Sequence, residues 1–400
     1  MMRKVTLLLP SLTLAAGLTY SVAQTRTHLP VPELHEVADN GLARTPPMGW
    51  NSWNHFAEKI DDATVRSIAD AMVSSGMMKA GYVYVNIDDT WEGTRDDAGN
   101  IRSNSKFPDM AALAAYVHSK GLKIGIYSSP GPKTCAKYEG SYGHEMQDAK
   151  TYANWGIDYL KYDWCSAHQI YSDAEMRGVY QKMGEALESA GRPIVFSLCQ
   201  YGRGQVWTWG TKAGGNLWRT TGDISDNWSS MSAIGFNQAA ISSYMRPGHW
   251  NDPDMLEVGN GGMSDDEYRV HMSLWCLLAA PLLAGNDLRN MSAATQAILT
   301  TEDVIAVDQD PAAKPVKRMV QADEDIEVWS RSMQDGSTVV AAFNRAEREK
   351  SVRVAWSDLG LTGQLKARDL WKHEDFSLSG DPVTVTIPKH GVVMWRVTNI

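Results

Sequence analysis

The chain has 400 residues, of which 43% are hydrophobic, and carries a formal net charge of −9. This length and apolar content suffice for one large domain and a smaller one, and we find no internal repeat or low-complexity segment. An acidic surface repels nucleic acid, so we expect no nucleic-acid partner.

The first residues have the form of a secretory signal. Arg3 and Lys4 precede an apolar run at 5–18, and a possible cleavage site follows at Ala23. The apolar run is too short to span a bilayer, and no cysteine lies near the cleavage point to carry a lipid. We therefore predict a signal peptide at 1–23, an N-terminal extension at 24–44, and export to the periplasm or the medium, without a membrane anchor.

From about residue 45, short β-rich runs alternate with helical stretches. Apolar residues at helical spacing, such as Val65, Ile68 and Met72, predict the helices. Strands that alternate with helices in this way indicate a parallel sheet, and eight strands favour a closed (β/α)8 barrel, an α/β fold, over 45–312. The eight strand candidates lie at 48–50, 82–87, 123–127, 159–162, 194–197, 217–219, 249–250 and 282–283.

Polar, acidic and aromatic residues follow the predicted strands. Barrels assemble their active sites at these carboxyl ends. An exported barrel with such strand ends, without a metal or nucleotide motif, points to glycoside hydrolysis, which needs two carboxylates. The segments are Asn51-Ser52-Trp53, Asp88-Asp89-Thr90-Trp91, Ser128-Ser129-Pro130-Gly131, Asp163-Trp164-Cys165, Asp223, and Asn251-Asp252-Pro253-Asp254.

Two of these carboxylates are candidates for the chemistry. Lys161 and Asp163 occupy alternate positions of one strand, so their side chains share a face, and a nearby ammonium keeps a carboxylate in the ionised state that a nucleophile needs. The alternative is a buried ion pair at a strand end. Asp223 is the second candidate, while Ser225 or Asp226 is better placed to cap the following helix.

After Pro311 the pattern changes to short alternating runs separated by turn residues. The runs lie at 326–329, 338–343, 352–354, 383–387 and 392–397. This pattern is typical of an antiparallel β-sandwich, which we predict over 313–400. The sandwich lacks carboxylate-rich strand ends, so we interpret it as structural or accessory, with carbohydrate binding as the alternative.

Six ordered motifs between residues 44 and 310 resemble glycoside hydrolase family 27, the α-galactosidase (melibiase) family of clan D, and the tail is similar to its C-terminal sandwich. The motifs are Arg44 to Trp53, Ile87 to Trp91, Gly125-Ile126-Tyr127 with Lys133-Thr134-Cys135, Leu160 to Asp163, Arg219 to Asp223, and Asn251 to Met255. The resemblance implies retaining hydrolysis of terminal α-linked galactose from oligosaccharides or polysaccharides such as galactomannans, without a cofactor or metal.

The resemblance also implies roles for individual residues. Asp163 would be the nucleophile and Asp223 the acid/base, with carboxyl groups about 5 Å apart. Asp223 must start protonated, so we expect desolvation or the charge of Asp163 to raise its pKa. Cys135 and Cys165 match a disulfide of the family, whereas we expect Cys199 and Cys276 to be free. Substrate contacts are implied at Trp53, Asp88, Asp89, Tyr127, Lys161, Gln200, Arg219 and Asp254.

One departure concerns the 2-position of the sugar. Many eukaryotic members have Cys-Glu-Trp at the end of the fifth strand, where this chain has Cys199-Gln200-Tyr201. Gln200 can donate and accept, which serves a 2-hydroxyl but does not exclude a 2-acetamido group. The alternatives are α-N-acetylgalactosaminidase, β-L-arabinopyranosidase and isomalto-dextranase activities, although intact Asp88-Asp89 favours galactose over arabinopyranose. A non-catalytic sugar-binding protein is the alternative from another class.

Overall fold

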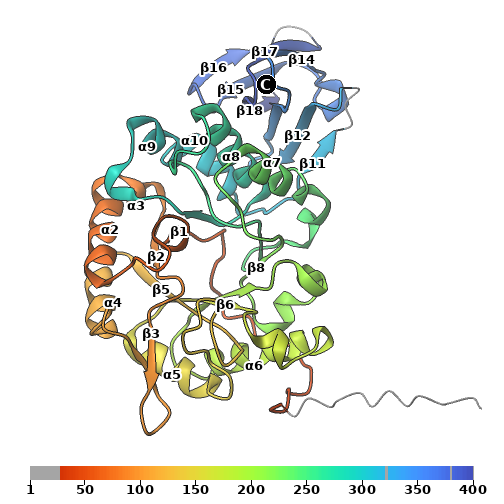
Figure 1. The fold of residues 1–400 in the computed structure, drawn as a ribbon. Coiled ribbons are helices and arrows are strands. Elements are labelled where there is room, and N and C mark those ends of the chain that lie inside the picture. Colours follow the sequence, from red (N-terminus) through yellow and green to blue (C-terminus); the bar gives the residue numbers. More distant parts are fainter. Residues whose placement is uncertain (1–27, 320–322, 379–380, 400) are drawn as a thin grey trace, which may run out of the picture.

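The computed structural model describes residues 28–319, 323–378 and 381–399; the signal peptide predicted at 1–23 lies outside them. A larger body of strands and helices carries a smaller body of strands, which contains the C-terminus (Figure 1). Among the helices described, none has both the length and the hydrophobicity of a membrane span.

The larger body is built around an eight-stranded parallel sheet in the order β10-β1-β2-β5-β6-β7-β8-β9. The segment after β9 meets β10, because Leu256 donates to Leu283 O at 2.8 Å and accepts from Gly285 N at 2.9 Å. All eight predicted strands, and the (β/α)8 barrel, are confirmed. The strands are β1 (Met48–Asn51), β2 (Tyr84–Asn86), β5 (Lys123–Ser128), β6 (Tyr159–Asp163), β7 (Val195–Cys199), β8 (Leu217–Arg219), β9 (Trp250–Asp252) and β10 (Leu282–Ala284).

Helices cover the outside of the barrel (Figure 1). The helix predicted around Val65 is α2, whose N-cap Asp61 accepts from Thr64 N and whose apolar positions Val65, Ile68 and Met72 are buried. The helices are α1 (Trp53–Phe56), α2 (Asp62–Ser74), α3 (Met77–Ala80), α4 (Met110–Ser119), α5 (Glu145–Trp155), α6 (Met176–Glu188), α7 (Trp228–Gly235), α8 (Asp265–Leu278), α9 (Ala293–Leu299) and α10 (Glu302–Asp308).

The capping prediction at α7 is wrong by one or two residues. Asn227, in an extended conformation, caps the helix by accepting from Ser230 N at 2.9 Å. Asp226 accepts instead from the hydroxyl of Tyr268 at 2.9 Å and from Gly262 N. The sequence offered several capping side chains in a row, and only the backbone conformation selects among them.

The smaller body is antiparallel, as predicted. A six-stranded sheet in the order β11-β12-β13-β18-β15-β16 packs with the β14-β17 pair around one apolar core. Arg331 of β12 is buried and donates to the carbonyl oxygens of Cys276 and Val307, so it joins this body to the ends of α8 and α10. The strands are β11 (Lys317–Met319), β12 (Ile326–Ser332), β13 (Thr338–Asn344), β14 (Lys350–Val354), β15 (Leu365–Asp369), β16 (Glu374–Ser377), β17 (Val383–Ile387) and β18 (Val392–Asn399).

Candidate active site

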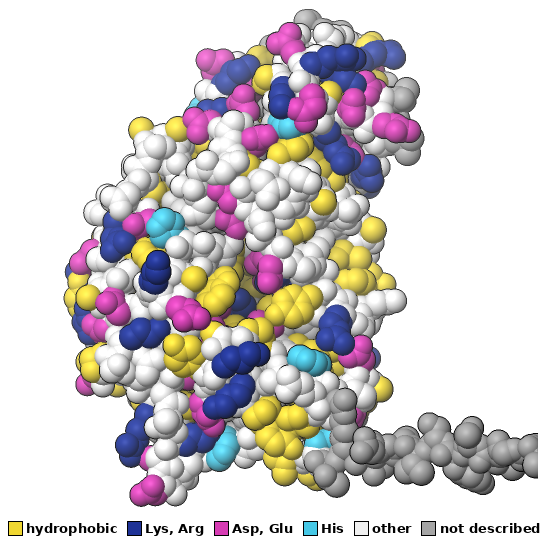
Figure 2. Space-filling view, viewed as in Figure 1, with side chains coloured by type: hydrophobic (Ala, Val, Ile, Leu, Met, Phe, Trp, Pro, Cys, Tyr) yellow, Lys and Arg dark blue, Asp and Glu magenta, His cyan; other side chains and the backbone are white. Residues whose placement is uncertain are grey.

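An open pocket of about 580 Å³ lies at the carboxyl ends of the barrel strands. The face of the molecule is hollowed near its centre, with acidic side chains around the hollow (Figure 2). The pocket is lined by Trp53, Asn54, His55, Ala57, Asp88, Asp89, Cys135, Lys161, Asp163, Arg219, Asp223, Ile224, Ser225, Asp226, Asp254, Met255, Glu257 and Asn260.

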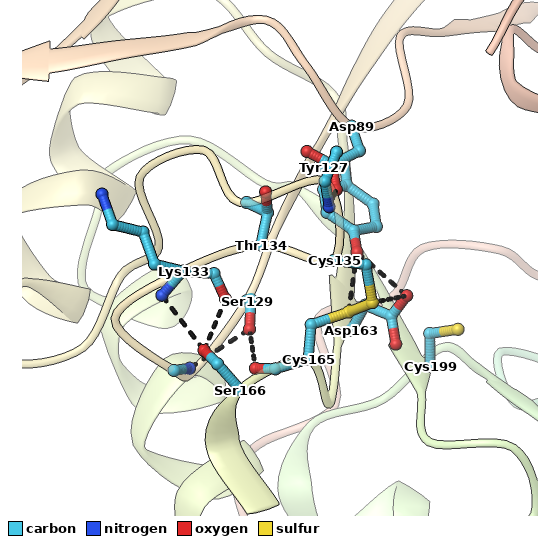
Figure 3. The surroundings of a disulfide bond; sticks show 12 residues. Asp89, Tyr127, Ser129, Lys133, Thr134, Cys135, Asp163, Cys165, Ser166 and Cys199 are labelled. Carbon is cyan, nitrogen blue, oxygen red and sulfur yellow. Dashed lines mark hydrogen bonds between the residues drawn. A yellow bond between two sulfur atoms is a disulfide. The ribbon is translucent and has the colours of Figure 1, made fainter. Parts of the chain in front are cut away.

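Asp163 is the last residue of β6, and its side chain is buried against two tyrosines. The hydroxyl of Tyr127 donates to Asp163 Oδ2 at 2.9 Å (Figure 3). Burial raises the pKa of Asp163, whereas Lys161 and the hydroxyls of Tyr201 and Tyr127 lower it. No described residue donates to Asp163 Oδ1, so this oxygen has a lone pair free for chemistry.

The ion pair that we expected between Lys161 and Asp163 forms with a different partner. The Lys161 ammonium donates to Asp88 Oδ2 at 2.8 Å, and Asn51 Nδ2 donates to the same oxygen at 2.8 Å. Lys161 still lowers the pKa of Asp163 through its charge, but burial is the larger effect. The ammonium of β6 thus pairs with the carboxylate that follows β2, two strands away in the sheet.

Asp89 forms the adjoining part of the wall. Its Oδ2 accepts from Ala136 N at 2.7 Å, and burial raises the pKa of Asp89 to about 6. Two adjacent carboxylates can accept hydrogen bonds from neighbouring hydroxyls of a sugar ring, and the ammonium beside them can donate one to it.

Arg219 organises the opposite wall. Its buried Nη2 lies 2.8 Å from Asp223 Oδ1 and 2.9 Å from Asp254 Oδ2. Asp254 has φ +92 and also accepts from Ile224 N, so a left-handed turn aims this carboxylate at the arginine. The desolvation that we expected at Asp223 is absent, because its side chain is 74% exposed. A bound sugar would have to supply that burial.

A disulfide joins Cys135 to Cys165 at the edge of the pocket (Figure 3). Cys135 Sγ lies 3.9 Å from Asp163 Oδ2, so the cross-link ties the loop after β5 to the end of β6. The two sulfurs and the Asp163 carboxylate lie close together, as metal ligands do. Because both sulfurs are oxidised in the disulfide, they lack the thiolate that binds metal, and this group of residues is not suited to a metal ion. Cys199 and Cys276 are free and buried, as expected.

The structure brings most of the implied contact residues together, with two differences. Tyr127 is buried and does not line the pocket, and its hydroxyl donates to Asp163. Gln200 is fully buried outside the pocket lining, and its amide has no hydrogen-bond partner among the described residues. The expected contact of Gln200 with the sugar is therefore not supported by this geometry.

The sequence analysis did not identify Tyr201, the residue after Gln200, whose side chain contacts the site residues Asp163 and Arg219. Tyr201 has φ +61, and the chain turns there after β7. Its ring lies 5.8 Å from the Arg219 guanidinium, and its hydroxyl forms a hydrogen bond with Asp163 that lowers the pKa of that carboxyl group. An aromatic residue one position beyond Gln200 was the available signal.

A second group missed by the sequence lies beside Trp53. Glu257 accepts from Asn54 and, at 2.6 Å, from Asn260, and burial raises the pKa of Glu257 to about 7. The polar loop that follows Asp254 was the signal. These side chains line the same pocket as Asp163.

A parallel barrel whose strand ends gather carboxylates and two cations around one open pocket belongs to the class of barrel glycoside hydrolases. The protein-family model described as "Alpha galactosidase A" matches residues 45–310. The family model described as "Alpha galactosidase C-terminal beta sandwich domain" matches residues 323–397. The chain belongs to the α-galactosidase family, glycoside hydrolase family 27.

Three relatives illustrate this membership. The chain is 49% identical to an α-galactosidase of Cyamopsis tetragonoloba, over 90% of this chain and 88% of that one. The crystal structure of α-galactosidase I from Mortierella vinacea superposes with a TM-score of 0.87 at 36% identity, covering 90% and 99% of the two chains. An α-galactosidase from Saccharomyces cerevisiae with raffinose superposes with a TM-score of 0.84 at 28% identity, covering 90% and 98%.

Proposed function

We propose that this protein is a retaining exo-α-galactosidase that removes terminal α-linked galactose from oligosaccharides or galactomannans. The observation that carries the proposal is one pocket lined by Asp163, Asp223, Asp88 and Lys161, in a chain of the α-galactosidase family. The raffinose bound by the yeast relative supports an oligosaccharide as substrate.

The reaction takes two steps. Asp163 attacks the anomeric carbon as the bond to the leaving oxygen breaks, and Asp223 gives that oxygen its proton. Asp223 then removes a proton from water, which displaces Asp163 and restores both carboxyl groups. The hydrogen bond from Tyr127 supports this role of Asp163, because it holds Oδ2 and leaves Oδ1 unpaired.

Sugar recognition falls to the two walls of the pocket. Asp88, Asp89 and Lys161 offer acceptors and a donor to hydroxyls, while Trp53 offers an apolar face. Both adjacent carboxylates are in place, which favours galactose over arabinopyranose. We assign Arg219 and Asp254 to the opposite wall, where Arg219 pairs with both Asp254 and Asp223.

Export is part of the proposal. The predicted signal peptide at 1–23 and the disulfide between Cys135 and Cys165 both suit an oxidising compartment, either the periplasm or the medium.

The test is a parallel assay of aryl α-galactoside, aryl α-N-acetylgalactosaminide and aryl β-L-arabinopyranoside, with proton NMR of the first sugar released. We expect preference for the galactoside and initial release of the α-anomer. Preference for either other substrate would refute the sugar assignment, and initial release of the β-anomer would refute retention. Binding of galactose without hydrolysis of any of the three would favour a non-catalytic sugar-binding protein.

A further inference from the structure

A second carboxyl group is buried directly behind Asp89. Glu92, the first residue of β3 (Glu92–Arg95), is 2% exposed, and its Oε2 accepts from Thr90 N at 3.0 Å. The same N–H donates to Asp89 Oδ1 at 2.7 Å. Both oxygens thus lie within 3.0 Å of one nitrogen. Ionising both of these buried carboxyl groups would be energetically costly, because two negative charges would lie side by side away from water. One of the two groups therefore holds a proton.

The hydrogen bonds show which one. Asp89 also accepts from Ala136 N at 2.7 Å and from the side chain of Thr134, and donors of this kind stabilise the ionised form. Glu92 Oε1 has no partner among the described residues and is buried, where a charge would be costly. Burial raises the pKa of Glu92 well above its ordinary range, and the negative charge of Asp89 adds to this. Glu92 therefore keeps the proton.

The backbone between the two acids is strained in a way that creates this arrangement. Thr90 has φ +88, a left-handed conformation that is unfavourable for a β-branched residue. The turn aims its N–H at both carboxyl groups, and the Lys106 ammonium donates to Thr90 Oγ1 at 2.8 Å from the other side. The contact with Lys106 thus stabilises a turn in which one N–H donates to both Asp89 and Glu92.

We propose that Glu92 is a positioning residue of the sugar site: as a neutral acid it shares the Thr90 N–H with Asp89 and keeps Asp89 as the anion that accepts a sugar hydroxyl. This rests on the proposed function, in which Asp89 contacts the galactosyl group. Loss of the Glu92 proton to solvent would place a second negative charge behind Asp89. Asp89 would then take up a proton or turn away, and sugar affinity would fall as the pH rises.

The charged and titratable groups that face Glu92 come from several elements. Asp88 and Asp89 follow β2, Lys106 precedes α4, Tyr138 lies in the loop after β5, and Tyr152 belongs to α5; Glu58 faces Lys106 and Tyr138 from the loop after α1. The acids oppose ionisation of Glu92 and Lys106 favours it. Full burial adds to the effect of the acids.

The test is the dissociation constant of free galactose, measured by calorimetry on the mature protein from about pH 7, where Asp89 is ionised, to about pH 9. For the wild type we expect affinity to fall by about tenfold or more toward the alkaline end. Glu92→Gln is an isosteric neutral side chain, so we expect affinity within about threefold of the wild type at about pH 7 and no alkaline fall. A flat wild-type profile would overturn the proposal without any variant, and so would an alkaline fall in Glu92→Gln that equals the wild type's.

Glu58→Gln is the matched control. It removes an exposed carboxylate that faces Lys106 but does not share the Thr90 N–H. We expect it to keep the wild-type pH profile. A flattened profile in Glu58→Gln would assign the effect to charge around Lys106 and contradict the proposal.

A second readout needs neither binding nor turnover. Infrared difference spectra between the wild type and Glu92→Gln at neutral pH should show a protonated-carboxyl C=O band in the wild type alone. Absence of that band overturns the proton on Glu92. If the band is present while aryl α-galactosides are not hydrolysed, the proposed function fails and the neutral Glu92 stands, so the two failures are distinguishable.

Discussion

The Lys161 ammonium donates to Asp88 across the mouth of the barrel at 2.8 Å, although Asp163 lies only two residues further along its own strand. Lys161 is mostly buried and Asp88 almost fully so, which makes this a desolvated ion pair at the base of the pocket. Such a pair is costly to break, because removal of one partner leaves the other charge buried.

Lys161→Met should therefore destabilise the protein by about 3–5 kcal/mol, because Asp88 loses its counter-ion. The double variant Lys161→Met/Asp88→Asn should recover part of this loss, and a chemical-denaturation double-mutant cycle measures the coupling. Additive losses in the cycle would mean that the pair contributes nothing. Both variants should raise KM for aryl α-galactosides, since both residues line the pocket.

Asp163→Asn should lower kcat on aryl α-galactosides by at least about 10³-fold, because it removes the nucleophile while shape and hydrogen-bonding reach stay similar. The melting temperature should not fall, since the substitution also removes a buried charge whose pKa burial raises. Steady-state kinetics and calorimetry check both expectations. Wild-type turnover in a folded variant would exclude the nucleophilic role.

Asp223→Asn should produce a loss that depends on the leaving group. General acid assistance contributes about 10²–10⁴-fold, and a nitrophenolate leaves without it, so the glycosylation step should suffer most with poor leaving groups. A series of aryl α-galactosides with graded phenol pKa values measures this slope in kcat/KM. An equal loss across the series would count against the acid role. Because Asp223 is exposed, stability should stay close to that of the wild type.

The Asp89 carboxyl group should make the folded protein less stable as the pH rises. Burial raises the pKa of Asp89 from 3.8 to about 6, so between these values the folded chain binds more protons than the unfolded chain. Stability is therefore lost as the pH rises through this window, by about 2–3 kcal/mol for this group. The difference in unfolding free energy between Asp89→Asn and the wild type should shrink by that amount between about pH 7 and about pH 4. A pH-independent difference would contradict the buried state of Asp89.

Removal of the disulfide should loosen the site as well as the fold. Cys135→Ser/Cys165→Ser opens a cross-link between residues separated by 30 in the sequence, for which a loss of about 2–4 kcal/mol is typical. Because the cross-link lies against Asp163, kcat should fall in the same variant. The control is Cys276→Ala, which replaces a free cysteine of α8 and should leave kcat unchanged. Unaltered stability and kcat in the double variant would show that the loop is held by other contacts.

Much of the fold could be predicted because its signals are local. Most barrel strands are short apolar runs followed by polar residues, and the predicted sandwich strands are short β-rich runs between turn residues, so periodicity and turn signals were sufficient. The strands β11, β15 and β16 were not predicted. They carry charged residues such as Lys317, Lys366 and Glu374 on exposed positions, which conceals the alternation. The cap of α7 was misplaced because Ser225, Asp226 and Asn227 are all suitable capping residues.

The sequence by itself determined the barrel, the sandwich and the set of carboxylates at the strand ends, because periodicity and motif order are properties of the chain alone. Tertiary structure decided that Lys161 pairs with Asp88, that Tyr201 rather than Gln200 contacts Asp163 and Arg219, and that Glu92 shares a donor with Asp89. Ion pairs, desolvation and shared donors depend on distances between segments far apart in the sequence. Those distances exist only once the strands are in register and the loops between them have folded over the barrel.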